Sequence, residues 1–286
     1  MDVNSTVFWV NGELVPAERA TTSARDHGLV VGDGVFEAVK VVQGTPFALG
    51  RHLDRMTRSA AGMGLPGFDA ERVRRAAEQV IDANRDLLVS DYDLLRITFT
   101  AGPGVLGSGR MAPEASTPTL VLGLTPGHDP DPQTGIVTVP YRRNEFGALT
   151  GLKTTSYGEN VLALAAAHAV GAGEAVFANT QGRLCEGTGT NVFVVRDGQL
   201  CTPPLSAGCL AGITRALVLE WVGAQEVDLP YDVLDTAEEL FLTSTARDVQ
   251  PVVAVDGRPV GDGTPGPVTR AAQAAFAAGQ ARYPEP

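Results

Sequence analysis

The sequence predicts an α+β protein of two domains, on three observations. The chain has 286 residues, of which 44% are hydrophobic and 19% are charged. This composition is globular, and the length allows one large or two medium domains. Segments with helix and strand periodicity follow one another irregularly, unlike the regular alternation of a doubly wound sheet. Residues 125–133 hold three prolines and a glycine without apolar periodicity, which is typical of a linker.

The linker separates a smaller N-terminal domain, residues 1–124, from a larger C-terminal domain, residues 134–286. In the first, the turn dipeptide Asn11-Gly12 between apolar runs predicts a hairpin. Apolar stripes at helical spacing predict two helices, the second capped by Asp69. The predicted elements are a hairpin at 7–10 and 13–15, strands at 34–42, 92–101 and 119–124, and helices at 51–63 and 69–88.

The C-terminal domain combines short strands with helices, and the sequence contains no internal repeat. An alanine-rich helix is expected to stop at Gly171, and Asp256-Gly257 predicts the turn of a hairpin over 252–259. The other predicted strands lie at 136–140, 175–178, 184–186, 191–195, 199–202 and 239–243, and the helices at 160–170, 213–222 and 268–282.

Charge and cysteine content argue against several classes of protein. The formal net charge of −11 disfavours nucleic acid or an anionic membrane as the main partner. No apolar run is long enough to cross a bilayer, and the first residues lack a signal-peptide pattern. The widely spaced Cys185, Cys201 and Cys209 form neither a disulfide framework nor a metal knuckle, so a cytoplasmic location is expected. No metal site is expected because the histidines are scattered, at His27, His52, His128 and His168.

Lysine is almost absent from this chain. Only Lys40 and Lys153 are lysines among 22 basic residues. Arginine stays protonated, whereas a lysine can lose its proton in a buried site and act as a nucleophile. Lys153 lies between a predicted strand and a predicted helix, among small hydroxyl residues, where it can face a cleft. Lys40 alternates with apolar residues in a strand, so it can point to either face.

Three further fragments complete a set that describes a ligand. Glu186 ends a strand at a glycine-rich turn, and Gly212-Ile213-Thr214 opens a helix, whose free N–H groups favour a phosphate. Thr245 follows a strand that ends in hydroxyls. A ligand with an aldehyde for Lys153, a basic ring nitrogen for Glu186 and a phosphate for the helix start is pyridoxal 5′-phosphate.

The order of these fragments resembles the fold-type IV, or class IV, pyridoxal-phosphate-dependent aminotransferase family. That family includes D-amino-acid aminotransferase, branched-chain aminotransferase and aminodeoxychorismate lyase. The likeness extends to Gly32-Asp33-Gly34-Val35-Phe36-Glu37, to His52-Leu53-Asp54-Arg55-Met56 and to Val268-Thr269-Arg270. It implies a smaller N-terminal α/β domain and a larger C-terminal α/β pseudo-barrel domain with the cofactor between them, and a homodimer.

The resemblance also implies roles for individual residues. Lys153 corresponds to the Schiff-base lysine and proton carrier, and Glu186 to the partner of the pyridine nitrogen. Tyr157 is a candidate for the ring hydroxyl, although the tyrosine of branched-chain enzymes lies one position later. The residues matched to phosphate contacts are Arg55, Gly212, Ile213, Thr214 and Thr245.

Matches to the substrate pocket are mixed. D-alanine-type enzymes have a tyrosine where this chain has Phe36, an arginine at Ala101 and a histidine at Pro103. Branched-chain enzymes share Phe36 and Arg96 but place tyrosines at the positions of Val31 and Leu94. Arg96, in an alternating strand, is the candidate ligand of the substrate carboxylate, with Lys40 as a weaker second cation.

These observations predict a transaminase that moves an amino group between an amino acid and a 2-keto acid. D-amino acids are slightly favoured, and primary (R)-amines would fit an open pocket. Two alternatives stay open: an aminodeoxychorismate lyase that releases pyruvate and 4-aminobenzoate, and a branched-chain L-amino-acid aminotransferase. A nucleotide-binding protein without catalysis is disfavoured, because the glycine-rich segment 102–110 lacks a Gly-Lys-Ser/Thr ending.

Overall fold

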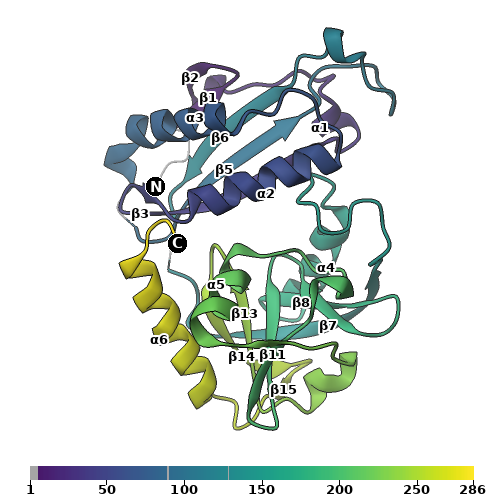
Figure 1. The fold of residues 1–286 in the computed structure, drawn as a ribbon. Helices are drawn as coiled ribbons and strands as arrows, with labels where there is room; N and C mark the ends of the chain where they lie inside the picture. The colour runs from purple at the N-terminus through teal and green to yellow at the C-terminus, as the bar shows by residue number, and fades with distance from the viewer. Residues whose placement is uncertain (1–5, 89, 128) are drawn as a thin grey trace. The chain divides into compact units, whose positions relative to one another are not determined.

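A computed structural model describes residues 6–88, 90–127 and 129–286 (Figure 1). The chain divides into two compact units. The N unit comprises Met1–Asp129, Leu152–Ser156 and Pro284–Pro286, and the C unit comprises Pro130–Gly151 and Tyr157–Tyr283. The segment that carries Lys153 therefore groups with the N unit, whereas the sequence predicts it in the C-terminal domain. His128, in the predicted linker, lies outside the described residues.

The N unit contains an antiparallel sheet in the order β2-β1-β6-β5-β3-β4. The predicted hairpin is confirmed, since Asn11 and Gly12 both have positive φ, as the tight turn requires. The strands are β1 (Val7–Val10), β2 (Glu13–Pro16), β3 (Gly34–Val42), β4 (Thr45–Pro46), β5 (Asp93–Thr100) and β6 (Thr119–Thr125).

Two helices, α2 (Leu49–Gly62) and α3 (Ala70–Ala83), pack on one face of this sheet (Figure 1). Alternate residues of β3 and β5 enter the same core, which the period of a strand explains. Shorter helical turns are α1 (His27–Val30) and the 3₁₀ segments Ala17–Arg19, Arg85–Leu87 and Pro113–Ala115.

The predicted helix 69–88 is wrong at its end, because α3 stops at Ala83. The next residue, Asn84, is buried, and its side-chain amide donates to the carbonyl oxygens of Val7 and Val80. Its Oδ1 accepts from the Val7 amide at 2.8 Å. Asn84 therefore hydrogen-bonds to Val7, the first residue of β1, and the helix ends there.

The C unit contains a mixed sheet in the order β12-β11-β10-β13-β14-β7-β8-β9, with β15 paired to β14. The predicted strand 136–140 is longer than expected, since β7 spans Thr134–Arg143 between β14 and β8. The other strands are β8 (Glu174–Asn179), β9 (Leu184–Gly187), β10 (Asn191–Arg196), β11 (Gln199–Thr202), β12 (Gln225–Glu226), β13 (Glu239–Ser244), β14 (Asp248–Val255) and β15 (Arg258–Pro259).

Helices of the C unit follow the sequence prediction closely. They are α4 (Gly158–Ala169), α5 (Ile213–Val222) and α6 (Pro267–Arg282), with 3₁₀ turns at Leu205–Ala207 and Tyr231–Asp235. Gly171, just beyond α4, has a φ of 78°, as a glycine that ends a helix commonly does. Among the described residues, no helix is both long and apolar enough to span a membrane.

Candidate active site

Lys153 lies on a short segment that runs beside β3 in the N unit. The Phe36 amide donates to the Lys153 carbonyl oxygen at 3.0 Å, and the Thr155 amide donates to the Gly34 carbonyl oxygen at 2.8 Å. The Lys153 amide donates to the Ser59 hydroxyl of α2 at 3.1 Å. The backbone of the candidate lysine is therefore anchored on both β3 and α2.

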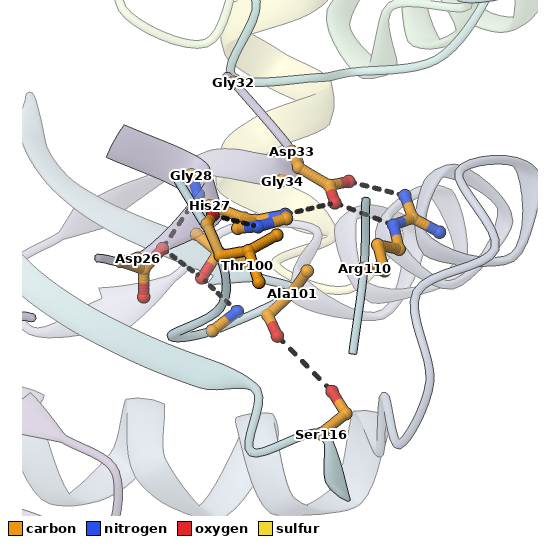
Figure 2. Close-up of polar contacts among 12 residues, drawn as sticks. Asp26, His27, Gly28, Gly32, Asp33, Gly34, Thr100, Ala101, Arg110 and Ser116 are labelled. Atoms are coloured by element: carbon orange, nitrogen blue, oxygen red, sulfur yellow. Dashed lines mark hydrogen bonds and ion pairs between the residues drawn. The ribbon is translucent and has the colours of Figure 1, made fainter. Parts of the chain in front are cut away.

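The turn before β3 is also held by side chains. The Thr155 and Ser156 hydroxyls donate to the Gly32 carbonyl oxygen at 3.0 and 3.2 Å. In the same turn, Asp33 accepts two hydrogen bonds from the Arg110 guanidinium, at 2.7 and 2.5 Å. Figure 2 shows the Arg110 side chain pointing at Asp33, with His27 on the other side of the carboxylate. These contacts fix the backbone to which the Lys153 segment is bound.

Phe36 brings two cations together. Its ring centroid is 4.4 Å from the Lys153 Nζ and 3.4 Å from the Arg96 Cζ. A cation over the face of an aromatic ring at such distances is attracted by the ring quadrupole. Three of the predicted site residues, Lys153, Phe36 and Arg96, are thus adjacent in the N unit.

Arg55, the predicted phosphate ligand, forms a buried two-point ion pair with Glu37. Its Nε and Nη2 donate to the two carboxylate oxygens, each at 2.7 Å. The His52 Nδ1 lies 2.7 Å from the same carboxylate. Burial opposes the charge of Glu37, but Arg55 and His52 outweigh it and hold the pKa of Glu37 far below its usual 4.5. Burial lowers the pKa of His52, against the opposing pull of Glu37.

The structure does not bring Lys40 into this group. Lys40 lies four residues beyond Phe36 on β3, where its side chain is buried and its Nζ is 3.9 Å from the Tyr92 ring centroid. At about 3.3 Å per residue in a strand, the two backbone positions are roughly 13 Å apart.

Glu186, the predicted partner of the ring nitrogen, lies on β9 of the C unit. One of its carboxylate oxygens accepts from the Leu210 amide at 2.8 Å, and the other lies 3.3 Å from the Arg143 Nε. Arg143 in turn donates to the Asn160 Oδ1 of α4 at 2.9 Å. These contacts fix the orientation of a carboxylate that could accept a hydrogen bond from a protonated ring nitrogen.

The start of α5 lies close to Glu186 through the loop before the helix. The Asn191 side chain donates to the Leu210 carbonyl oxygen at 2.9 Å. A Cβ at Gly212 would lie 2.0 Å from the Asn191 Oδ1, so a larger residue would displace the Asn191 amide. Gly212 caps α5 without a side-chain hydrogen bond, and Ile213 and Thr214 form the first turn. First-turn N–H groups with the positive end of the helix dipole suit a phosphate.

Two other predicted residues belong to the C unit. Thr245 directly follows β13, whose Thr243 pairs with Asn191 of β10. Tyr157 directly precedes α4, the helix that carries Asn160. The C unit therefore contains the Glu186 carboxylate, the start of α5 at Gly212 and the hydroxyl residue Thr245 after β13. A carboxylate, a helix N-terminus and a hydroxyl are donor and acceptor groups that fit pyridoxal 5′-phosphate.

Sequence reasoning did not find the residues that position this site. Ser59, Arg143 and Asn191 carry no local signal, because their partners lie far away in the chain. Glu37 appeared only within a matched motif. One signal was present: Glu37 shares a strand face with Val35 and Val39, so its charge had to be buried and paired.

Comparison with known proteins identifies the family. A model of the family described as amino-transferase class IV matches residues 34–255. The putative branched-chain-amino-acid aminotransferase of Methanocaldococcus jannaschii is 33% identical over 274 residues, covering 92% of each chain. The D-alanine aminotransferase of Staphylococcus haemolyticus is 31% identical over 283 residues, covering 95% of this chain and 96% of that one.

A solved structure extends the likeness to the fold. The branched-chain amino acid aminotransferase of T.th., complexed with N-(5′-phosphopyridoxyl)-L-glutamate, is 27% identical, with a TM-score of 0.85 over 100% of this chain and 96% of that one. The predicted fold-type IV class is thereby confirmed. The chain belongs to the class IV aminotransferases, a family of enzymes that use pyridoxal 5′-phosphate.

Proposed function

We propose that this aminotransferase moves the amino group of an α-amino acid to a 2-keto acid, with Lys153 as the reactive amine and Arg96 as the carboxylate ligand. The observation that carries this proposal is the shared Phe36 ring, which holds both cations within 4.4 Å of its centroid. An amino acid presents its amino and carboxylate groups on one carbon. It therefore suits a site where a reactive lysine and a guanidinium are neighbours.

The residues assigned to the cofactor by the family resemblance have distinct tasks. When bound, the cofactor would supply an electron-withdrawing ring that stabilises negative charge at the substrate α-carbon. Lys153 would hold the cofactor covalently and carry the proton of the α-carbon. Glu186 would keep the ring nitrogen protonated, and Tyr157 is assigned to the ring hydroxyl. Arg55, Gly212, Ile213, Thr214 and Thr245 are assigned to the phosphate.

Replacement of Arg96 tests the carboxylate assignment. Arg96→Ala is expected to raise the KM for amino acids by about tenfold or more, the loss typical of a charge-assisted hydrogen bond. It should leave (R)-phenylethylamine, which has no carboxylate, little changed. Arg74→Ala, on α3 and away from Phe36, is the matched control. An equal loss for amino acids and amines would remove Arg96 from this role.

For the preferred donor we propose D-amino acids, on the likeness of residues 32–41 to the D-alanine enzymes. A putative branched-chain-amino-acid aminotransferase and a D-alanine aminotransferase match at similar identity, 33% and 31%. A panel of both enantiomers of alanine and leucine, with a 2-keto acid, tests the proposal. Turnover of D-alanine above L-leucine supports it, and the reverse supports the branched-chain L-amino-acid alternative.

The lyase alternative has a separate readout. A lyase would release pyruvate from aminodeoxychorismate with no keto acid present, and it would turn over no donor of the panel. Amino transfer with any donor of the panel contradicts a dedicated lyase.

We also propose a homodimer located in the cytoplasm. Val161 and Leu162 of helix α4, and Val170 directly after it, are exposed, with 62%, 63% and 71% of each residue's surface accessible. Exposed apolar side chains that gather on one surface commonly mark an interface between proteins. Light scattering should give twice the mass of the chain, and Leu162→Glu should lower it. A monomeric wild-type protein would contradict the dimer, and cell fractionation tests the location.

A further inference from the structure

Helix α2 begins without a cap of its own. Its N-cap residue is Ala48, which has no side-chain acceptor and adopts a left-handed φ of 55°. No acidic residue lies in the first turn. The first N–H groups of a helix have no intrahelical partner and need an acceptor.

The acceptor comes from the other end of the sequence. The Glu285 carboxylate accepts from the Leu49 amide at 3.0 Å and from the Gly50 amide at 3.1 Å. The Ala48 amide donates to the Pro284 carbonyl oxygen at 2.8 Å. The Arg51 Nε donates to the main-chain oxygen of Pro286, also at 2.8 Å. Each residue of the segment 284–286 thus contacts the start of α2, and all of them belong to the N unit.

Helix α2 is the helix on which the N-unit part of the site depends. It carries Arg55, paired with Glu37, and Ser59, which accepts the hydrogen bond of the Lys153 amide. His52 lies one turn before Arg55 and contacts the same carboxylate. A helix of one continuous hydrogen-bond ladder transmits disorder of its first turn to the following turn.

We propose that Glu285 is a positioning residue of the cofactor site, which acts by capping α2 and so holding Arg55 and Ser59 in place. This inference rests on the proposed assignment of Arg55 to the cofactor phosphate. The negative carboxylate also complements the positive end of the helix dipole. Glu285 touches neither Lys153 nor Arg55 in the contacts described above, so its effect reaches the site only through the helix.

Three variants of the full-length holoenzyme separate this role from general stabilisation. Glu285→Ala removes both acceptor oxygens. Glu285→Gln keeps one acceptor oxygen but removes the charge. Asp54→Ala, at an exposed position of the same helix, removes one negative charge without touching the cap. Two quantities are measured on each variant: hydrogen exchange of the amides of residues 49–53, and the rate of cofactor release by absorbance.

Glu285→Ala should accelerate both exchange and cofactor release by about fivefold, the factor expected from loss of a helix cap. Glu285→Gln should lie between Glu285→Ala and the wild type, and Asp54→Ala should match the wild type.

Three outcomes would overturn the proposal, and they are distinguishable. Unchanged exchange in Glu285→Ala would show that the cap is not formed. Faster exchange with unchanged cofactor release would reduce Glu285 to a stabiliser of the helix. A wild-type protein that binds no cofactor would overturn the proposed function itself, and this inference with it.

Discussion

Helices α2 and α3 have the same length, 14 residues, and pack on the same face of the N-unit sheet, yet they serve different ends. The buried residues of α3 are all apolar, and its cap, Asp69, directly precedes it. Helix α2 buries His52, Arg55 and Ser59 beside its apolar residues, and its cap comes from Glu285. Helix α2 therefore contributes polar contacts to the candidate site as well as apolar packing.

The energetic difference follows from burial. Apolar side chains gain free energy when they leave water, at about 25 cal/mol for each Å². A buried charge loses its hydration, and an ion pair repays that loss only when its geometry is good. Arg55 and Glu37 have such geometry, yet apolar residues of similar volume often stabilise a fold as much as a buried ion pair does, so stability alone does not explain the pair.

The largest expected effect is the loss of stability when an arginine is removed from α2 rather than from α3. Arg55→Ala leaves Glu37 buried without its guanidinium, and the free energy of unfolding should fall by about 3–5 kcal/mol. The matched change on α3, Arg75→Ala, removes an exposed arginine and should alter it by about 0.5 kcal/mol or less. Denaturant unfolding of both variants measures the difference. Equal small losses would mean that the buried ion pair is not formed.

A second pair of variants asks whether packing alone distinguishes the helices. Leu53→Ala on α2 and Ile81→Ala on α3 both truncate buried side chains, and each should lose about 2–5 kcal/mol of stability. Only Leu53→Ala should also accelerate cofactor release, because it loosens the helix that carries Arg55. Faster release from Ile81→Ala would contradict the division of roles.

The pH dependence of stability should report the buried histidine of α2. Burial lowers the pKa of His52 from 6.5, so the folded protein keeps it neutral where the unfolded chain binds a proton. The unfolded state then holds more protons, and the free energy of unfolding falls as the pH drops below about 6.5, by up to about 1.4 kcal/mol per pH unit. Glu37, whose pKa is also lowered, adds a loss of the same sign below about pH 4.5.

Substitution of His52 isolates this contribution. His52→Gln should flatten the slope of stability between about pH 6.5 and 5, because the group that takes up a proton on unfolding is gone. His168→Gln, at an exposed position of α4, should leave the slope unchanged. An identical slope in the wild type and in His52→Gln would contradict the burial of a neutral imidazole.

The smallest effect is expected at the local cap. The Asp69 carboxylate accepts from the amides of Glu71 and Arg72, and Asp69→Ala should lose about 1 kcal/mol of stability. Cofactor release should stay at the wild-type rate, in contrast with Glu285→Ala. Thermal unfolding and absorbance measure the two quantities, and faster release in Asp69→Ala would make α3 part of the site as well.

The same contrast explains what the sequence can and cannot predict. Helix α3, its cap and its apolar stripe are all local signals, so they were predicted correctly up to the end of the helix. That end depends on Asn84 pairing with Val7, a contact 77 residues apart. The cap of α2 by Glu285 spans 236 residues at Leu49 and 235 at Gly50, and no local pattern encodes it.

The candidate site likewise combines residues with a local sequence signal and contacts between distant segments. Lys153, Glu186 and Gly212 stand at junctions of elements, and such junctions are visible in a sequence. Their supporting contacts, such as Ser59 with the Lys153 amide and Arg143 with Glu186, arise only when distant segments pack. Lys40 shows the limit of a local signal, because the sequence left its direction open as a weaker second cation for the substrate, whereas the fold turns it to Tyr92 and not to Phe36.

The most direct test is to identify the lysine that binds the cofactor. Pyridoxal 5′-phosphate is added to the purified protein, the adduct is reduced with borohydride, and the labelled peptide is identified by mass spectrometry. We expect the label on Lys153 and no label in Lys153→Ala. A label on Lys40, or a wild-type protein that takes up no label, would contradict the assignment of Lys153 as the reactive amine.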